Sequence, residues 1–330
     1  MMTTIAQLVA TRGADPMVRL FRRSRWTCIA LLMFCSMAHA MPPPRPNSIT
    51  RFHIGPGDGL LVSTSYQRYF RGSPTGSVWD PTTPEAWPVL DARFDDVNPI
   101  IVGQSEYGCD GAGVFKRANA VRTALGSLPG TDWCRSIVYF GANLYAVTRD
   151  ALYLSDDLGM HWTRLAGLPF IQNVRLFSGL THGVYASAIS LDGSSSVAYR
   201  YDPERGWRKI DFGAPRSRGD NPDAGWYSET DFQPSLIAMI DDIMYASSFA
   251  GLVRSVDGGQ RWESFQAGLP DPLKARNIAP LDVVFVIRQN SAGLLYAATW
   301  RGIYRYIQRE QRWEPIPLDG TRIGDAFFGK

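Results

Sequence analysis

Two stretches of this 330-residue sequence share the frame Ser-x-Asp-x-Gly-x-x-Trp: Ser155-Asp156-Asp157-Leu158-Gly159-Met160-His161-Trp162 and Ser255-Val256-Asp257-Gly258-Gly259-Gln260-Arg261-Trp262. We call each of these stretches a box. A fixed frame of turn residues that closes on an aromatic residue is typical of a repeat, and a repeat indicates the architecture of a chain. It indicates no chemistry, because function depends on sites that vary between proteins of one fold.

The boxes belong to a longer repeat. A short apolar segment that ends in Tyr-Ala begins eighteen residues before each box tryptophan, and the same spacing recurs before Trp313. A further copy before Trp207 is five residues longer, and the loop 191–195 accounts for the insertion. The four segments are 144–146, 184–186, 244–246 and 295–297.

Each unit contains four predicted strands. The Tyr-Ala segment is the second strand, and an apolar first strand precedes it at 136–140, 236–240 or 283–287. A third strand begins with a small residue, at 151–153, 251–253 or 302–304, and a fourth strand follows the box. Gly-Leu-Pro then ends the unit at 167–169 and 268–270. Short apolar strands separated by turn residues favour antiparallel hairpins.

Two weaker copies complete the repeat. In one copy, 100–103 and 113–115 match the second and third strands, and Ser127-Leu128-Pro129 ends the unit. In the other, the candidate strands are 60–64, 68–70 and 87–90. Six units over residues 47–318 predict an all-β chain that forms a six-bladed β-propeller of four-stranded antiparallel blades. A seventh blade, built from 211–234 and the C-terminal tail, and a large β-sandwich stay open as alternatives.

The frame resembles the Asp box, the bacterial neuraminidase repeat that sialidases share with sortilin-type and photosystem II assembly-factor-like propellers. The resemblance implies a structural turn between the third and fourth strands. Ser and Asp side chains hydrogen-bond nearby backbone groups in such turns, and glycine supplies a positive φ. Each tryptophan is expected to contribute about 2–3 kcal/mol by burial. The residues of this structural turn are Ser155, Asp157, Gly159 and Trp162 in the first box and Ser255, Asp257, Gly259 and Trp262 in the second.

The first forty residues are predicted to be a cleaved signal peptide. Four arginines between residues 19 and 25 precede the apolar run 26–37, and Ala38-His39-Ala40 is a small-x-small cleavage pattern. The apolar run is too short to span a bilayer, so we expect no membrane span in the mature chain. The mature chain, residues 41–330, is predicted to be a single propeller domain in the periplasm or secreted.

The predicted cleavage changes the charge and the cysteine content of the chain. It removes five arginines and one aspartate, so the net charge falls from +3 to −1, and nothing then points to nucleic acid as a partner. Cys109 and Cys134 remain, and one pair of cysteines in an exported chain predicts a disulfide, with two free buried thiols as the alternative. No cofactor is expected, and no metal is expected because the histidines show no ligand spacing.

The resemblance implies that the boxes lie on one face of the propeller and that ligands bind at the other. The other face carries the turns between second and third strands and the links between blades. Aromatic rings stack on sugars and arginines pair with carboxylates, which suits a protein or glycan partner, although such aromatics also simply cover blade edges. The candidate ligand-binding residues are Tyr107, Arg149, Phe249, Trp300 and Arg301, and Asp150, Asp132, Trp133, Trp226, Tyr227 and Glu229 share that face.

Two functional hypotheses follow. The first is a non-catalytic propeller that binds a protein or glycan ligand or scaffolds an envelope or extracellular assembly. The second is a glycan-cleaving hydrolase of the sialidase type. Sialidases carry Phe-Arg-Ile-Pro before the first box, and the nearest string here, Arg51-Phe52-His53-Ile54, does not match. Hydrolysis needs two acids at the glycosidic bond, and nothing singles out Asp150, Glu229 or Asp231. We therefore assign no catalytic residue and favour the binding hypothesis.

Overall fold

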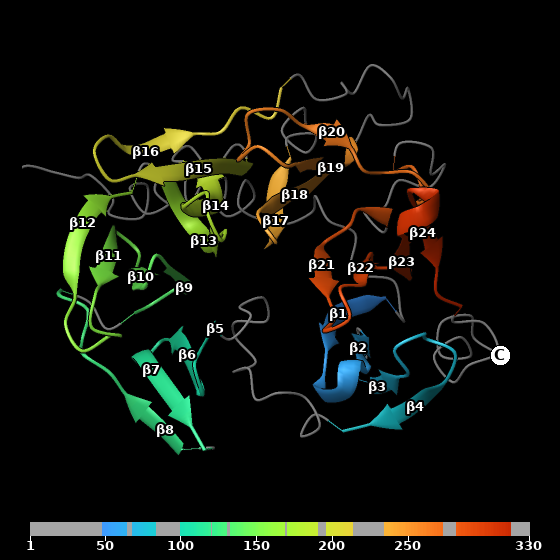
Figure 1. Ribbon diagram of the computed structural model, residues 1–330, viewed down its shortest axis with the longest axis horizontal. Coiled ribbons are helices and arrows are strands. Elements are labelled where there is room, and N and C mark those ends of the chain that lie inside the picture. The colour runs from blue at the N-terminus through green and yellow to red at the C-terminus, as the bar shows by residue number, and fades with distance from the viewer. Residues whose placement is uncertain are drawn as a thin grey trace, which may run out of the picture. The chain divides into compact units, whose positions relative to one another are not determined.

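Six antiparallel sheets of four strands make up the part of the chain that the structure describes. The computed structural model describes residues 48–64, 68–83, 100–119, 121–130, 133–168, 170–190, 196–213, 234–272 and 282–317. The predicted signal peptide therefore lies outside the described residues. Within each sheet the strands pair in the order in which they occur along the chain, so each sheet is a simple meander. We number the sheets as blades 1 to 6 (Figure 1).

The strands have the following bounds. Blade 1 contains β1 (Ile49–Ile54), β2 (Leu60–Thr64), β3 (Tyr69–Gly72) and β4 (Trp79–Thr82), and blade 2 contains β5 (Ile100–Val102), β6 (Ser105–Asp110), β7 (Gly113–Ala118) and β8 (Val121–Ala124). Blade 3 contains β9 (Ser136–Phe140), β10 (Asn143–Val147), β11 (Ala151–Ser155) and β12 (Thr163–Gly167), and blade 4 contains β13 (Phe170–Ser178), β14 (Val184–Ser190), β15 (Ser196–Asp202) and β16 (Gly206–Lys209). Blade 5 contains β17 (Ser235–Ile240), β18 (Ile243–Ser248), β19 (Gly251–Ser255) and β20 (Glu263–Ser264), and blade 6 contains β21 (Val286–Gln289), β22 (Leu295–Ala298), β23 (Ile303–Ile307) and β24 (Arg312–Pro315).

The predicted six-bladed propeller is confirmed, and the register of the two weak copies is corrected. In blade 2 the segment that begins at Ile100 is the first strand, whereas the sequence suggested the second, and β6 takes the second place. In blade 1 the fourth strand is β4, which precedes the expected segment 87–90; that segment lies outside the described residues. Most of the stretch considered for a seventh blade, 214–233, also lies outside them.

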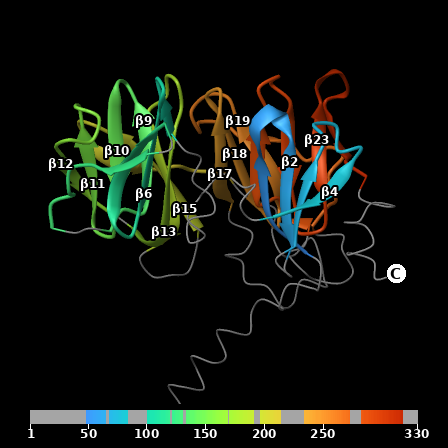
Figure 2. The same ribbon diagram turned by 90° about the horizontal axis from the view of Figure 1, so that it is seen from below.

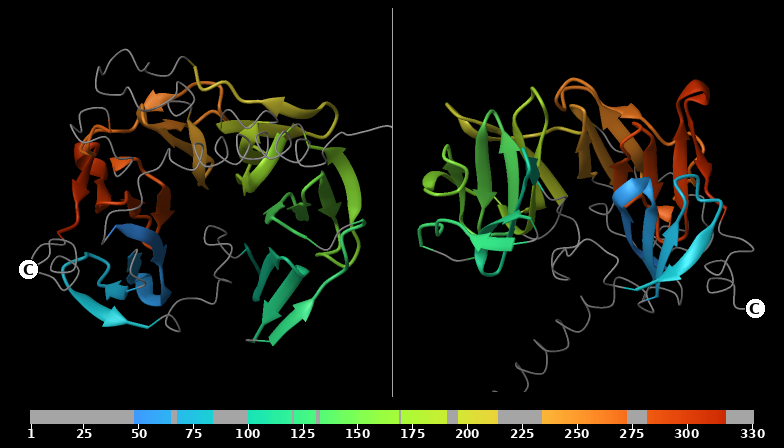
Figure 3. Two further views of the ribbon diagram at one scale, coloured as in Figure 1. Left: turned by 180° about the vertical axis from the view of Figure 1, so that it is seen from behind. Right: turned by 60° about the horizontal axis from the view of Figure 1, so that its bottom comes forward.

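The hydrophobic core lies between successive blades. The first strands contact one another in the order β5, β9, β13, β17, β21 and β1, so blade 6 lies beside blade 1 (Figures 1 and 3). Five clusters of buried side chains fill the spaces between blades 2 and 3, 3 and 4, 4 and 5, 5 and 6, and 6 and 1. Each of these sheets therefore has apolar side chains on its faces.

The Tyr-Ala repeat explains how one strand serves two such clusters. Successive side chains of a strand point to opposite faces of the sheet. In blade 6, Tyr296 packs in the cluster shared with blade 1, while Ala297 packs in the cluster shared with blade 5. Blade 4 repeats the arrangement with Tyr185 and Ala186. The large ring and the small methyl group alternate because the second strand is buried on both faces.

Each box closes the turn between the third and fourth strands with side-chain hydrogen bonds. The Ser155 hydroxyl donates to Asp157 Oδ1 (2.8 Å) and accepts from the Gly159 N–H (2.7 Å). Asp157 Oδ1 also accepts from the N–H groups of residues 160 and 161, at 3.0 and 2.9 Å. Ser255 and Asp257 form the same bonds in the second box, with donor–acceptor distances of 2.9–3.0 Å. Gly159 and Gly259 adopt φ of +94° and +88°, as the turn requires.

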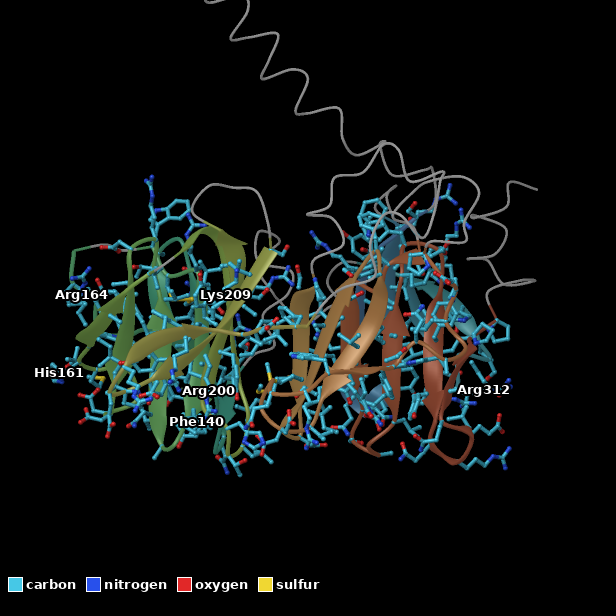
Figure 4. The ribbon with its side chains drawn as sticks, turned by 90° about the horizontal axis from the view of Figure 1, so that it is seen from above. Phe140, His161, Arg164, Arg200, Lys209 and Arg312 are labelled. Atoms are coloured by element: carbon cyan, nitrogen blue, oxygen red, sulfur yellow. A yellow bond between two sulfur atoms is a disulfide. The ribbon has the colours of Figure 1, made fainter. Side chains whose placement is uncertain are left out.

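The acid at the third position of each box, Asp157 or Asp257, is committed to the turn. The backbone N–H and the ring of His161, and then the Ser155 hydroxyl, hold the pKa of Asp157 well below its usual range. His161 lies at the outer edge of its blade (Figure 4). Trp162 is 8% exposed in the cluster between blades 2 and 3, and Trp262 is half-buried against Phe212, with ring centroids 4.8 Å apart. The boxes are thus structural turns.

Neighbouring blades are also joined by hydrogen bonds. Thr181, in the turn after β13, donates its N–H and hydroxyl to Asp242 of blade 5, at 3.0 and 2.7 Å. Ser291, in the turn after β21, donates to Asp58 of blade 1 in the same way, at 2.9 and 2.6 Å. Both carboxylates lie in turns between first and second strands, so this contact recurs around the ring.

We expect the two adjacent acids of the first box to differ sharply in their effect on stability. Asp157→Ala should lower the midpoint of thermal unfolding by about 2–6 °C, because its carboxylate accepts four hydrogen bonds that hold the turn. Asp156 is exposed, so Asp156→Ala is the matched control and should leave the midpoint unchanged. Equal midpoints for the two variants, measured by circular dichroism, would contradict the assigned turn role.

The stability of the protein should be sensitive to a single methyl group added in the Gly-Leu-Pro segment at 268–270. The Trp313 N–H donates to Ala267 O (2.8 Å), and a Cβ on Gly268 would overlap the Trp313 carbonyl oxygen. Gly268→Ala should destabilise the protein by about 2–4 kcal/mol in urea unfolding. Gly130 has a similar φ, with open space around the Cβ position. Gly130→Ala should therefore lose only about 1 kcal/mol of unfolding free energy, from backbone strain alone. If Gly130→Ala lost as much unfolding free energy as Gly268→Ala, the overlap with Trp313 would be refuted.

Candidate functional site

The two faces of the propeller carry different turns. In the side view of Figure 2 the strands run between the faces. Because the four strands of a blade alternate in direction, the boxes and the turns after the first strands share one face. The turns between second and third strands, and the links between blades, share the other, which we call the link face.

Four of the five candidate ligand-binding residues occupy the expected turns. Arg149 is exposed in the turn between β10 and β11, and Phe249 is half-buried in the turn between β18 and β19. Trp300, half-buried, and Arg301, exposed, lie in the turn between β22 and β23.

Tyr107 does not lie at the link face, and its expected position was wrong. It belongs to β6, is 2% exposed and packs between blades 2 and 3. The error follows from the register of blade 2, where the turn between second and third strands comes three residues later, after Asp110. Of the other residues expected on this face, Asp132, Trp226, Tyr227 and Glu229 lie outside the described residues.

Side chains at the ends of the second strands fix the turns of the link face. The Thr299 hydroxyl accepts from the N–H groups of Arg301 and Gly302, at 3.2 and 3.1 Å, and Thr148 holds the turn of Arg149 in the same way. In blade 2, Asp110 accepts from Ala112 N (2.8 Å). The side chains on this face are therefore carried by turns that are already ordered.

Arg301 forms an ion pair beneath the link face. Its Nη1 lies 3.5 Å from Oδ2 of Asp282, which is almost fully buried. Burial raises the pKa of the Asp282 carboxyl, and the Arg301 charge opposes that rise. Because the Arg301 side chain is 46% exposed, it remains within reach of a ligand at the face.

Trp133 is the most exposed aromatic side chain among the residues whose burial the structure describes. It lies on the link between blades 2 and 3 with 56% of its surface exposed. The next residue, Cys134, forms the predicted disulfide with Cys109 of β6, with the Cα atoms 5.4 Å apart. The Cys134 N–H also donates to Asp110 O (3.3 Å). The backbone that carries this exposed ring is therefore anchored to blade 2.

Arg135 and Arg149 lie on backbone segments close to Trp133. Arg135 N donates to Val147 O (2.8 Å), which continues the pairing of blade 3 up to the link. This pairing brings the link beside the turn that carries Arg149. Gly111, in the adjacent turn of blade 2, lies under the Trp133 ring. We call Trp133, Arg135 and Arg149 the Trp133 patch.

A second candidate site is the central channel. A cavity of about 540 Å³ is lined by the first strands of all six blades. Most of the wall is apolar, but Arg175 of β13, Arg288 of β21 and His53 of β1 also line it, together with Asp241 just after β17. A cavity of this volume lies in the range of small-molecule sites. The sequence reasoning missed these residues, although a single charge inside an apolar first strand is a usable signal.

The cations of the channel influence one another. Burial, and then the neighbouring charge of Arg175, lower the pKa of Arg288 to about 10. Burial, and then the charge of Arg288, lower the pKa of His53 to about 4, so His53 is neutral at pH 7. Asp241 accepts a hydrogen bond from Gln289 Nε2 (3.0 Å) at one end of the channel. The channel wall therefore carries two positive charges and one negative charge.

Neither a metal-binding cluster nor a membrane-spanning helix occurs among the described residues. These residues contain no group of three or more His, Cys, Asp or Glu side chains that could hold a metal ion. Their helices are all too short or too polar to cross a bilayer. Asp150 accepts a hydrogen bond from the Thr148 hydroxyl (2.7 Å), while Glu229 and Asp231 lie outside the described part of the chain.

Comparisons with known proteins give structural likeness only. No protein-family model matches the chain, and no curated protein matches it. The chain is similar to the extracellular domain of BT4673 from B. thetaiotaomicron, with 13% identity and a TM-score of 0.48, over 85% of this chain and 34% of that one. It thus spans about a third of that protein chain.

Two further similar structures are of comparable length to this chain. One is YCF48 bound to D1 peptide, with 15% identity and a TM-score of 0.42, over 82% of this chain and 83% of that one. The other is YCF48 from Cyanidioschyzon merolae, with 12% identity and a TM-score of 0.43, over 84% and 87%. At these identities and TM-scores the likenesses carry no conclusion about function.

The disulfide should contribute measurably to stability. The double variant Cys109→Ser, Cys134→Ser should lose about 3 kcal/mol of unfolding free energy in urea, because the bond closes a 25-residue loop in the unfolded chain. Wild-type protein unfolded in a reductant should lose a similar amount. Unchanged urea midpoints in both experiments would mean that the bond does not form in solution.

Proposed function

We propose that this chain is an exported, non-catalytic propeller of the Asp-box type that binds a protein or glycan partner at its Trp133 patch. The observation that carries the proposal is the exposure of Trp133 beside a disulfide. A tryptophan side chain has a large apolar surface, and in soluble proteins most of that surface is usually buried. Placing one in solvent on an anchored backbone is unfavourable for the free protein and favourable for a partner that covers the ring.

The chemistry of the patch suits such a partner. An indole ring stacks on the face of a sugar or on an aromatic or aliphatic side chain. The neighbouring Arg135 and Arg149 offer planar donors for carboxylates. Because the disulfide and the ordered turns hold these groups before binding, little conformational entropy is lost on association.

The proposed family and location rest on separate observations. Two boxes with the same hydrogen bonds support the Asp-box type. The signal-like leader and the disulfide support export to the periplasm or the cell exterior. No described residue favours the glycan-cleaving alternative, so we do not propose it.

The Trp133→Ala variant tests the proposal. We expect it to lose at least tenfold in affinity for a partner that wild-type protein captures from the envelope fraction of its source cell, or for a glycan that it binds on an oligosaccharide array, because aromatic anchors carry much of the binding energy of such surfaces. The measurement is the dissociation constant of the identified partner by surface plasmon resonance.

Leu180→Ala is the matched control. Leu180 is 78% exposed in the turn after β13, on the opposite face, so its variant removes a similarly exposed apolar side chain. It should bind the partner as wild type does. If Trp133→Ala also keeps wild-type affinity, the partner does not use the Trp133 patch and the proposal fails.

A further inference from the structure

Arg288 is a half-buried cation without a counterion in the described part of the chain. Its Nη1 donates to Ile287 O (3.1 Å), while its Nε is shielded from solvent and has no hydrogen-bond partner. A guanidinium carries five N–H donors, so most of its capacity is unused by described residues. A charge that is partly withdrawn from water is stabilised when an opposite charge or a hydrogen-bond partner replaces the lost water.

The surroundings of Arg288 make its uncompensated positive charge more unfavourable. The nearest charge that affects it is another cation, Arg175, which reaches the channel from blade 4. On the neighbouring blade His53 is neutral and adds no negative charge. The one carboxylate in the wall, Asp241, is hydrogen-bonded to Gln289 at the end of the channel. Two arginines therefore converge on one cavity from different blades.

The cavity offers room for a ligand that would pair with these charges. Its volume of about 540 Å³ accommodates a small organic molecule. Planar guanidinium groups bind carboxylate and phosphate oxygens in pairs, and the bond is strong where water is excluded. The walls contributed by Ile137, Leu176 and Ile237 would cover an apolar portion of the ligand.

We propose that the central channel binds a small organic ligand through its oxyanion group, a carboxylate or a phosphate, which pairs with Arg288 and Arg175 beside His53. The three side chains lie near the ends of their first strands, toward the face that carries the boxes. The site is therefore separate from the Trp133 patch and does not depend on the partner proposed there.

The test compares anion-dependent stability in wild type and Arg288→Met. Thermal unfolding is followed at constant ionic strength in chloride, with citrate as the carboxylate probe and inorganic phosphate as the phosphate probe. A probe at 100 times its dissociation constant should raise the wild-type midpoint by about 5 °C. The probe that gives the larger shift distinguishes the two oxyanions. Without a probe, Arg288→Met should be at least as stable as wild type, because a half-buried charge without a counterion in the described residues has been removed.

Arg288→Met should show no shift with either probe, whereas Arg312→Met should keep the wild-type shift. Arg312 lies at the outer edge of blade 6 and pairs with Glu310 and Glu314 (Figure 4). Trp133→Ala should also keep the shift, so a failure of this proposal is distinguishable from a failure of the proposed function. The proposal is overturned if neither probe stabilises wild type, or if Arg288→Met responds equally, which would show a general salt effect.

A second variant covers the case in which Arg288→Met does not fold. Arg288→Lys keeps the charge but cannot form the two-point pairing of a guanidinium with an oxyanion. We expect it to bind the effective probe at least tenfold more weakly in isothermal titration calorimetry. An affinity equal to that of wild type would overturn the assignment of Arg288 as the pairing group.

Discussion

The burial of both faces of a four-stranded sheet is the constraint on which the rest of this structure depends. A sheet of short strands rich in apolar and aromatic residues cannot cover its own faces. Here each cluster of buried side chains is shared by two successive blades. The alternation of Tyr296 with Ala297, and of Tyr185 with Ala186, places a large ring on one face and a small side chain on the other. The arrangement of blades around a channel follows from this packing.

Hydrogen bonds between turns join neighbouring blades in addition to the apolar packing. Asp58 and Asp242 each accept from the turn of the preceding blade, and the boxes hold the turns at the outer edges of blades 3 and 5. These acids are therefore occupied by structural roles. Carboxylates that look available in the sequence are thus partnered in the fold, and this weakens any catalytic reading of the boxes.

The two candidate sites suit different kinds of ligand. The Trp133 patch is an open surface with an exposed ring and flanking arginines, and it suits a macromolecular partner or an extended glycan. The channel is a partly open cavity with two converging arginines, and it suits a small molecule with an oxyanion. The predicted mature chain has a net charge of only −1, so the positive character of the channel is local. It results from Arg175 and Arg288, which blades 4 and 6 bring to the same cavity.

Much of the architecture could be predicted because the repeat is periodic. The spacing from Tyr-Ala to tryptophan located the second strands of four blades. The third strands of three of these blades were located with it, and the boxes located the following turn in two of them. Where the repeat was weak, in blade 2, the register was misassigned and Tyr107 was placed at the surface. The disulfide could be predicted because only one pair of cysteines follows the predicted signal peptide. Trp133 was recognised as a residue of the link face, but its exposure was not predictable from the sequence.

By itself, the sequence determined the blade pattern, the turn residues and the cysteine pair, because each depends on residues close together in the chain or on simple counting. Only the tertiary structure decided that His53, Arg175 and Arg288 line one channel. These residues belong to blades 1, 4 and 6, and the sequence holds no short-range signal that connects them. Their proximity arises from the arrangement of the blades around a common axis, and that arrangement depends on the packing between sheets.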